Sequence, residues 1–375
     1  MELLRKWDCN VPTLRFKQYH CPWSTYHLSD IAEVVGGGTP DTTVPSLWNG
    51  DIQWFTPTEV GHQKYVSKSA RTITQLGLQK SSAKKLPAGS ILLSSRATIG
   101  ECSIAQRECT TNQGFQNLIP KNDTNNEFLY YLAQTKKHHF IKYASGSTFL
   151  EISNSEIRKT KCTVPGTEEQ TQIAAFLSAL DDRISVQNKI ISKYETLIKG
   201  LCNMIFRHNK SVSLSDLVKC KTSALQENMV STCHRGEYKV LGASGAIAAI
   251  DTYQFEENGI LVLKDGSKAG KIQFAEGKYS VIGTSVVLIP NEACDARYLY
   301  FAMSSIDFEK YKVGSGIPHI YFKDYSNERI YYPEKSLRKR ITEALDAYDI
   351  KLGIEKEMLS ALQKQKAFLI KSMFI

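Results

Sequence analysis

The sequence predicts an α+β protein in which a mixed α/β domain followed by a long helix occurs twice, as an internal repeat. Three observations predict it: short motifs recur in the same order in both halves, each half ends in a heptad-patterned run, and 375 residues suffice for two domains. We expect a first domain over 1–165, a helix over 166–207, a second domain over 208–333 and a second helix over 334–375.

The two halves of the sequence align in a consistent register. A shift of 170 residues places the segment 89–93 on 259–263, and no gap is needed over 32 positions. Near the start of each half, Leu28–Ile31 matches Leu214–Leu217 with a larger shift, so the second copy is shorter at its front. Several matches in one order are not expected by chance, and they indicate a duplication.

The elements of each domain follow from apolar runs between Gly and Pro residues. The segments Glu127–Tyr143 and Ala296–Tyr311 are predicted to be helical. The predicted strands are Ile52–Phe55, Ser90–Ser94, Ile260–Leu263 and Ser285–Ile289. Each domain is therefore expected to be mixed α/β with strands dominating.

A long helix is predicted after each domain. Thr167-Glu168-Glu169-Gln170 has the form of a capping box that begins the first of them. Along each run, apolar residues recur at alternating spacings of four and three and form a seam on one side of the helix. A seam of this length needs a partner helix, and the helix of the other copy is the obvious one. An ordinary core helix is the alternative, but about 60 Å of helix fits a spacer better.

The seam has a polar residue at the same point in both helices. Gln187 and its counterpart Glu355 interrupt it, which indicates control of register. The predicted seam residues are Ile173, Leu177, Leu180, Ile184, Gln187, Ile191, Tyr194, Ile198 and Leu201 in the first helix, and Ile341, Leu345, Tyr348, Leu352, Glu355, Leu359, Leu362 and Leu369 in the second.

Composition narrows the class of partner and the compartment. The net charge of +9 favours an anionic partner such as nucleic acid, although a merely basic cytoplasmic protein is the alternative. We expect no membrane span because no long apolar run occurs. The start of the chain lacks the apolar block of a secretory signal, and the nine cysteines show no metal-site spacing, so we expect a cytoplasmic protein.

The loops between strands keep their arrangement in both copies but change their polar side chains. Ser94–Gly100 corresponds to Lys264–Gly270. Two readers of different base sequences should differ in this way, because base edges are read by side-chain identity; free drift after duplication is the alternative. The Gly-Ser turns at 144–148 and 312–316 suit phosphate contacts, although a flexible Gly-Ser loop is the alternative and is favoured when these turns are taken alone. The candidate DNA contacts are Lys64, Lys68, Ser95, Arg96, Thr98, Asn112, Gln113, Ser147, Thr148, Lys264, Ser267, Lys268, Thr284, Ser315 and His319.

No catalytic constellation is duplicated with the fold. The absence of adjacent prolines excludes the Asn-Pro-Pro-aromatic motif of amino-methyltransferases. Gly266–Lys271 falls one residue short of a phosphate loop, and Ile272 stands where Ser or Thr would bind magnesium. We therefore expect no catalysis and no bound cofactor or metal. A coiled-coil scaffold that binds proteins, or a stand-alone nuclease or methyltransferase, are the alternatives.

The combined pattern resembles the specificity subunit of type I restriction–modification enzymes, over essentially the whole chain. Each motif is short, and the set is specific through its order and duplication. The second copy departs from the family in lacking the Gly-Gly-Thr-Pro and Asn-Gln-Gly-Phe stretches. The motifs that carry the resemblance are Pro12–Phe16, Trp23, Leu28–Ile31, Gly37–Pro40, Trp48, Ile52–Trp54, Arg96–Gly100, Asn112–Phe115 and Pro165 with Glu168–Ala174.

The resemblance implies a division of labour within a complex. Each domain would be a target-recognition domain that reads one half of a split double-stranded DNA target. The two helices would pack antiparallel, with approximate two-fold symmetry, and set the gap. Two modification subunits that bind S-adenosylmethionine would dock on this chain and methylate adenine in each half-site. A restriction subunit would translocate and cleave DNA using ATP, and this chain itself would catalyse nothing.

Overall fold

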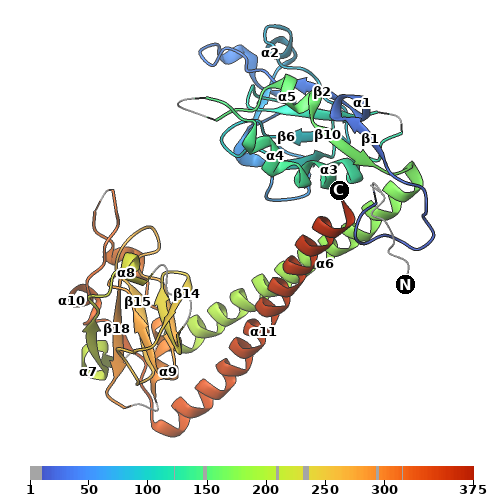
Figure 1. The fold of residues 1–375 in the computed structure, drawn as a ribbon. Helices are drawn as coiled ribbons and strands as arrows, with labels where there is room; N and C mark the ends of the chain where they lie inside the picture. The colour runs from blue at the N-terminus through green and yellow to red at the C-terminus, as the bar shows by residue number, and fades with distance from the viewer. Residues whose placement is uncertain are drawn as a thin grey trace, which may run out of the picture. The chain divides into compact units, whose positions relative to one another are not determined.

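The computed structural model describes residues 11–121, 123–146, 150–207, 211–230, 236–292, 295–314 and 316–375. The chain divides into two units, residues 1–187 with 358–375, and residues 188–357. Each unit therefore contains one α/β domain and part of both long helices, which Figure 1 labels α6 and α11.

The first domain is built on a five-stranded sheet in the order β2-β9-β6-β7-β4. Neighbouring strands are antiparallel except β4, which runs parallel to β7. The strands are β2 (Ala32–Gly36), β9 (Gln116–Pro120), β6 (Ile91–Leu93), β7 (Cys102–Ala105) and β4 (Tyr65–Val66). The helices of the domain are α1 (Leu28–Ile31), α2 (Gln75–Gln79), α3 (Asn126–Thr135), α4 (Lys137–Lys142) and α5 (Asn154–Lys159).

Two smaller sheets complete the first domain. In one, β3 (Trp48–Phe55) lies between antiparallel β5 (Arg71–Ile73) and parallel β8 (Cys109–Thr111). In the other, β1 (Ser24–His27) pairs with β10 (Lys161–Val164), the strand that leads into α6.

The second domain repeats this topology. Its main sheet has the order β12-β18-β15-β16, and one small sheet has the order β14-β13-β17, again with one antiparallel and one parallel pair. The strands are β11 (Val212–Ser213), β12 (Val218–Thr222), β13 (Tyr238–Gly242), β14 (Gly245–Ile250), β15 (Gly259–Leu263), β16 (Ile272–Ala275), β17 (Tyr279–Val281), β18 (Ser285–Pro290) and β19 (Arg329–Ile330). The helices are α7 (Leu214–Leu217), α8 (Glu227–Val230), α9 (Ala296–Met303) and α10 (Phe322–Tyr325).

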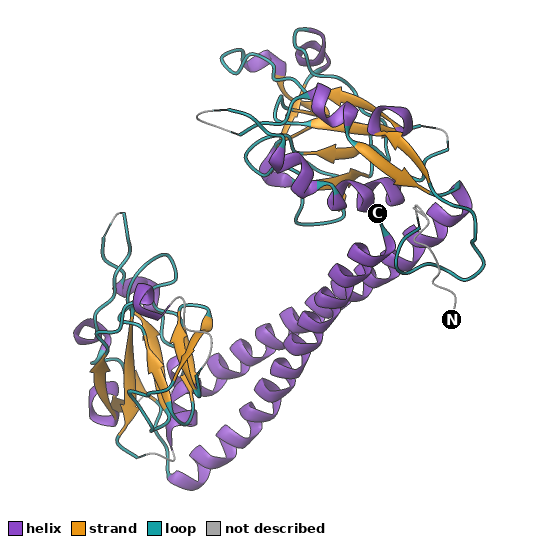
Figure 2. Ribbon diagram, viewed as in Figure 1, coloured by secondary structure: helices purple, strands orange, loops and turns teal. Residues whose placement is uncertain are grey.

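The duplicated topology confirms the internal repeat. Both domains show orange sheets flanked by purple helices in Figure 2, and a two-stranded sheet, β1-β10 or β11-β19, precedes each long helix. Within the described residues, the main sheet of the second domain has no counterpart of β4. The second copy is thus shorter at its front, as the sequence register indicates.

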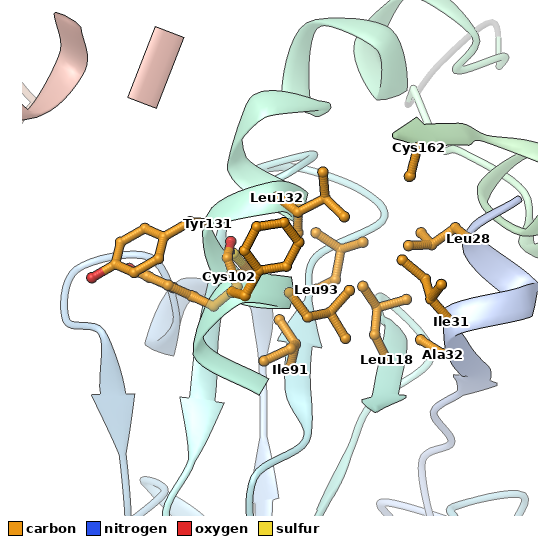
Figure 3. Packing of buried hydrophobic residues seen from close by; sticks show 14 of the residues in the cluster. Leu28, Ile31, Ala32, Ile91, Leu93, Cys102, Leu118, Tyr131, Leu132 and Cys162 are labelled. Atoms are coloured by element: carbon orange, nitrogen blue, oxygen red, sulfur yellow. The ribbon is translucent and has the colours of Figure 1, made fainter. Parts of the chain in front are cut away.

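The domain cores follow strand alternation. On β6, Ile91 and Leu93 pack beneath α3 in the main cluster, whereas Leu92 packs on the opposite face with Phe55. Figure 3 shows this main cluster, with Tyr131 at its edge and the tyrosine hydroxyl pointing away from the aliphatic side chains. The central strands are therefore buried on both faces.

The predicted domain helices are shorter than expected. The single helix expected over Glu127–Tyr143 is wrong, because α3 ends at Thr135 and α4 begins at Lys137. The Lys136 N–H donates to the carbonyl of Ala133, which closes a tight turn between them. Likewise α9 ends at Met303, and only a 3-10 turn at Phe308–Tyr311 continues the expected second helix.

The long helices α6 (Thr167–Phe206) and α11 (Lys335–Met373) pair antiparallel within each unit. In the first unit, Ile173 and Leu177 share a core cluster with Met373, and Asp181 pairs with Lys366 at 2.5 Å. In the second unit, Glu195 pairs with Lys356 at 2.7 Å, and the seam packs into the domain core.

Most predicted seam positions are buried or partly buried, including Gln187, which is 6% exposed. Tyr348 is the most exposed of the predicted seam residues, at 37%.

The predicted capping box at Thr167 is also wrong. The Thr167 hydroxyl donates to the carbonyl of Asp123, and the Gln170 side chain donates to that of Pro165. Thr167 therefore bonds to the segment that precedes α3, and Gln170 bonds to the segment that precedes α6. Neither side chain caps the first turn of α6.

Candidate nucleic-acid interface

Three predicted motifs of the first domain meet at one edge of its sheets, where β2, β3, β6 and β8 end. The Gly38 N–H donates to the carbonyl of Thr111 at 2.9 Å. The Thr39 hydroxyl donates to the Gln113 side chain, and the Ser95 N–H donates to the carbonyl of Gly114 at 2.8 Å. We call residues 37–40, 94–98 and 112–115 the first loop cluster.

The first loop cluster needs glycine at its closest approach. A Cβ on Gly37 would lie 1.9 Å from the carbonyl oxygen of Asn112. The turn after β6 contains Ala97 at φ 61°, a left-handed conformation that is strained for a residue with a side chain. The edge of the sheets is therefore tightly built.

Several predicted contacts of the first domain are placed on this surface. Thr98 and Gln113 of the first loop cluster are exposed, and so is Lys68, which lies outside the cluster. Arg96 is 33% exposed, with its guanidinium 3.9 Å from the Glu151 carboxylate, so it keeps hydrogen-bonding capacity. The Asn112 side-chain oxygen accepts from the Gly114 N–H at 2.8 Å and shapes the turn. Ser147 and Thr148 lie outside the described residues.

Two predicted contacts are wrong for this structure. Ser95 is fully buried, because its backbone bridges two loops beneath the surface. Lys64 is 8% exposed, and its ammonium donates to Glu127 at 3.0 Å and to Ser178 of α6 at 2.5 Å. Lys64 therefore binds the domain to the helix and does not face a nucleic acid.

The second domain brings its predicted residues together at the corresponding edge. The Lys264 N–H donates to the carbonyl of Thr284 at 2.9 Å, and the Gly266 N–H donates to that of Pro318 at 3.0 Å. His319 Nδ1 lies 2.8 Å from the Asp265 carboxylate. Ser267, Lys268 and Thr284 are exposed, Lys264 and His319 are half-buried, and Ser315 lies outside the described residues.

A basic hollow of about 600 Å³ adjoins the turn at 267–271. It is lined by Lys199 of α6, by Lys268 and Lys271 of the turn, and by Lys312. Lys312 is paired with Glu309 at 2.7 Å, and Asp307 also lines the hollow. The surrounding charge is nevertheless positive, which suits polyanion backbones.

The base of the first domain is fixed on the helices by a polar network around Glu127. Burial alone would raise the pKa of Glu127, but hydrogen bonds from Ser178, Tyr65 and Lys64 hold it below its ordinary value. Beside it, the Tyr131 hydroxyl donates to Asp181 of α6 at 2.6 Å, and Asp181 also pairs with Lys366 of α11.

The second domain is fixed by two arginines. Arg297 of α9 pairs with Asp346 and Asp349 of α11, each at 2.5 Å. Burial alone would lower the pKa of Arg297, but hydrogen bonds with these two carboxylates raise it. Arg338 of α11 donates to both oxygens of Asp295, at 3.0 and 2.9 Å, and these side chains are 8% and 5% exposed.

Sequence reasoning missed Arg71 on β5, whose guanidinium lies 3.6 Å from the centre of the Trp48 ring. The signal available in the sequence was a cation in a strand that pairs with a tryptophan-rich strand.

No helix in the described part of the chain is long and apolar enough to cross a membrane. Among the same residues, no group of three or more His, Cys, Asp or Glu side chains is placed to hold a metal.

The chain is similar to known specificity subunits. It is 38% identical over 195 residues to the MjaIX specificity subunit of Methanocaldococcus jannaschii, covering 50% of this chain and 45% of that protein. It is 28% identical over 175 residues to the EcoR124I/EcoR124II subunit of Escherichia coli, covering 45% and 43%. The chain thus spans less than half the length of these relatives, whereas its match to the EcoprrI subunit of Escherichia coli, at 21% identity, covers 86% of each protein.

Solved structures share the fold. The S subunit of a type I restriction–modification system from M. genitalium superposes with a TM-score of 0.63 at 16% identity, covering 97% of this chain and 99% of that one. A chain from a structure of type I system assembly gives 0.53 at 15% identity, covering 94% and 98%. The family model of the type I restriction modification DNA specificity domain matches residues 21–196 and again 207–364. The chain therefore belongs to the type I restriction modification DNA specificity family and carries the family's domain twice.

Proposed function

We propose that this chain is the DNA-specificity subunit of a type I restriction–modification complex. Each domain reads one half of a split double-stranded target through its loop cluster. The supporting observation is that both domains gather polar and basic loops at the same sheet edge but present different side chains there. Direct readout of two unlike half-sites requires this combination.

The helices α6 and α11 set the distance between the half-sites in this proposal. An antiparallel helix pair is stiffer than a flexible linker, so it fixes the number of unread base pairs between the two halves. Its outer surface also gives two modification subunits a place to dock. Exposed apolar side chains on the helices, such as Val186 at 54% and Ile354 at 55%, suit such partners.

Catalysis belongs to the partners in this proposal. The modification subunits bind S-adenosylmethionine and methylate an adenine after flipping it from the duplex. Restriction subunits use ATP to translocate and cleave DNA. This chain binds no cofactor itself, and it works in the cytoplasm, where its DNA target lies.

Methylation mapping tests the assignment. Cells expressing this chain with its modification subunits should carry N6-methyladenine in one bipartite motif. Replacing residues 24–165 with the corresponding domain of a relative should change one half of that motif and leave the other half and the gap unchanged. Changes in both halves, or no sequence-specific methylation, would contradict the proposal.

A heptad insertion tests the role of the helices as the spacer. Seven residues inserted into α6 after Gln187 and into α11 after Glu355 should lengthen the gap and keep both half-sequences. If either half-sequence changed instead, the helices would not act as the spacer.

A further inference from the structure

Arg71 is held flat against an aromatic pair in the first domain. Its guanidinium lies 3.6 Å from the centre of the Trp48 ring and 5.6 Å from that of Trp54. The two tryptophans meet edge to face at 5.0 Å and are 6% and 4% exposed. At 3.6 Å the guanidinium carbon is in contact with the face of the indole, the arrangement of a cation–π pair.

The backbone around Arg71 is also fixed. The Ser69 hydroxyl donates to the carbonyl of Arg71 at 2.6 Å and accepts from the Trp54 N–H at 3.0 Å. The Ser69 N–H donates to the buried Gln53 side chain at 2.7 Å. Side chain and backbone are therefore both pre-organised, so little conformational entropy is lost when the cation binds an anion.

Arg71 carries a charge that the described residues do not neutralise. None of their carboxylates lies within 4 Å of its guanidinium. The nearby carboxylate of Glu59 accepts instead from the Ala70 N–H at 2.7 Å and from the Thr56 N–H at 2.8 Å. Arg71 is exposed, so its N–H groups remain available to solvent or to a ligand.

Arg71 lies on the flank of the first loop cluster. The Trp54 indole N–H donates to the carbonyl of Gly38, the residue before Thr39, at 2.9 Å. Lys68, three residues before Arg71, is exposed on the same segment. Cations that flank base-reading loops typically contact phosphates, which position a domain without reading sequence.

The feature is specific to the first domain. In the small sheet of the second domain, Val240 and Ala248 pair as Trp54 and Arg71 do in the first. Both are buried and neither can bind an anion. A contact through Arg71 would thus strengthen only the half-site read by the first domain.

We propose that Arg71 is a backbone-phosphate contact of the first domain, oriented by its stacking on Trp48. This role rests on the proposed DNA-binding function. A planar guanidinium with free N–H groups on one edge binds two oxygens of a phosphate side by side.

The test uses the full chain purified with its modification subunits and two labelled duplexes, one with the mapped methylation motif and one without it. Arg71→Met keeps the apolar stem over Trp48 and removes the charge. It should weaken binding to both duplexes by a similar factor, roughly five- to tenfold at about 0.1 M salt, and lower the slope of log affinity against log salt by about 1. Arg71→Lys should recover only part of the affinity, because it keeps charge without the planar pair of donors.

The matched control is Lys161→Met, which removes an exposed cation of the same domain on β10, outside the loop cluster. It should leave both affinities and the salt slope unchanged, and melting temperatures should show that all variants are folded. Normal binding by Arg71→Met, or a loss confined to the motif duplex, would overturn the phosphate role while leaving the proposed function intact. Failure of the wild-type complex to bind either duplex would overturn both.

Discussion

The two domains are fixed to the long helices at equivalent positions, but at one of these positions the domain side chains, Glu127 and Arg297, carry opposite charges. In the first domain Glu127 of α3 accepts from Ser178 of α6. At the shifted positions of the second domain, Arg297 of α9 pairs with Asp346 of α11. At this pair of positions the acidic side chain is on the domain in one copy and on the helix in the other, while Asp181 of α6 and Asp349 of α11 keep an acidic residue on the helix in both copies.

The contacts at the helix starts differ in the same way. In the first copy the Gln170 side chain accepts from the Asn125 N–H at 3.0 Å and donates to Pro165. In the second copy Arg338 and Asp295 occupy the corresponding positions and form an ion pair. The two copies therefore share the positions at which the domain contacts the helix, but they differ in the side chains that make the contact.

The largest expected effect is at Arg338. Arg338→Met leaves the 5% exposed Asp295 carboxylate without its cation and should destabilise the second unit by about 3–5 kcal/mol. Gln170→Met removes neutral hydrogen bonds only and should cost the first unit about 1–2 kcal/mol. Circular dichroism during urea unfolding of the full chain measures both units, and tryptophan fluorescence reports the first alone, since all four tryptophans precede residue 55. Equal losses would contradict the comparison.

Reversing the charge at Arg297 should have the next largest effect. Arg297→Glu faces Asp346 and Asp349, and because these side chains are 22–28% exposed we expect a loss of about 2 kcal/mol. Adding Asp346→Lys to the same chain should restore much of the loss, although Asp346→Lys alone is destabilising. A double-mutant cycle without coupling would show that the sign of the contact does not matter.

Acid should weaken the contact of the first copy at Glu127. Its pKa in the folded chain lies below the ordinary 4.5, so its stabilisation is complete above that pH and is lost as pH falls through the folded pKa. Glu127→Gln should therefore destabilise the first unit at neutral pH and progressively less in acid. Tryptophan fluorescence in urea at several pH values measures this, and a difference independent of pH would argue against an ionised Glu127.

The smallest expected effect compares the turns after β6 and β15. A Cβ added to Gly266, which has φ 88°, would meet only open space, so Gly266→Ala should cost about 1 kcal/mol through backbone strain alone. Ala97→Gly relieves the strain at φ 61° but raises the conformational entropy of the unfolded chain. It should therefore stabilise the folded protein by less than about 1 kcal/mol. Thermal melting tests both; a stabilising Gly266→Ala would be inconsistent with the left-handed turn.

Local patterns in the sequence predicted the repeat, the central strands and the long helices. Strand alternation and heptad spacing are visible within a few residues, so β6 and the seam at Ile173 follow directly. The role of Lys64 was not predictable in this way. Its partners Glu127 and Ser178 are 63 and 114 residues away, and only the folded chain brings them together.

The candidate interface was predicted in outline for a similar reason. Loop position indicates which segments share a sheet edge, so the meeting of Thr39 with Gln113 was foreseeable. Whether a loop side chain points outward depends on tertiary contacts, and Ser95 points inward. Arg71 escaped notice because its environment is made by Trp48, which is 23 residues away in sequence.

The opposite signs at Glu127 and Arg297 limit how such genes can be shuffled. A crossover that carried the first domain into the second position would set Glu127 against Asp346 in place of Ser178, so two carboxylates would repel where the parent has an ion pair. If each domain reads one half-site, as proposed, hybrid chains should fold best when each domain keeps its own place along the sequence.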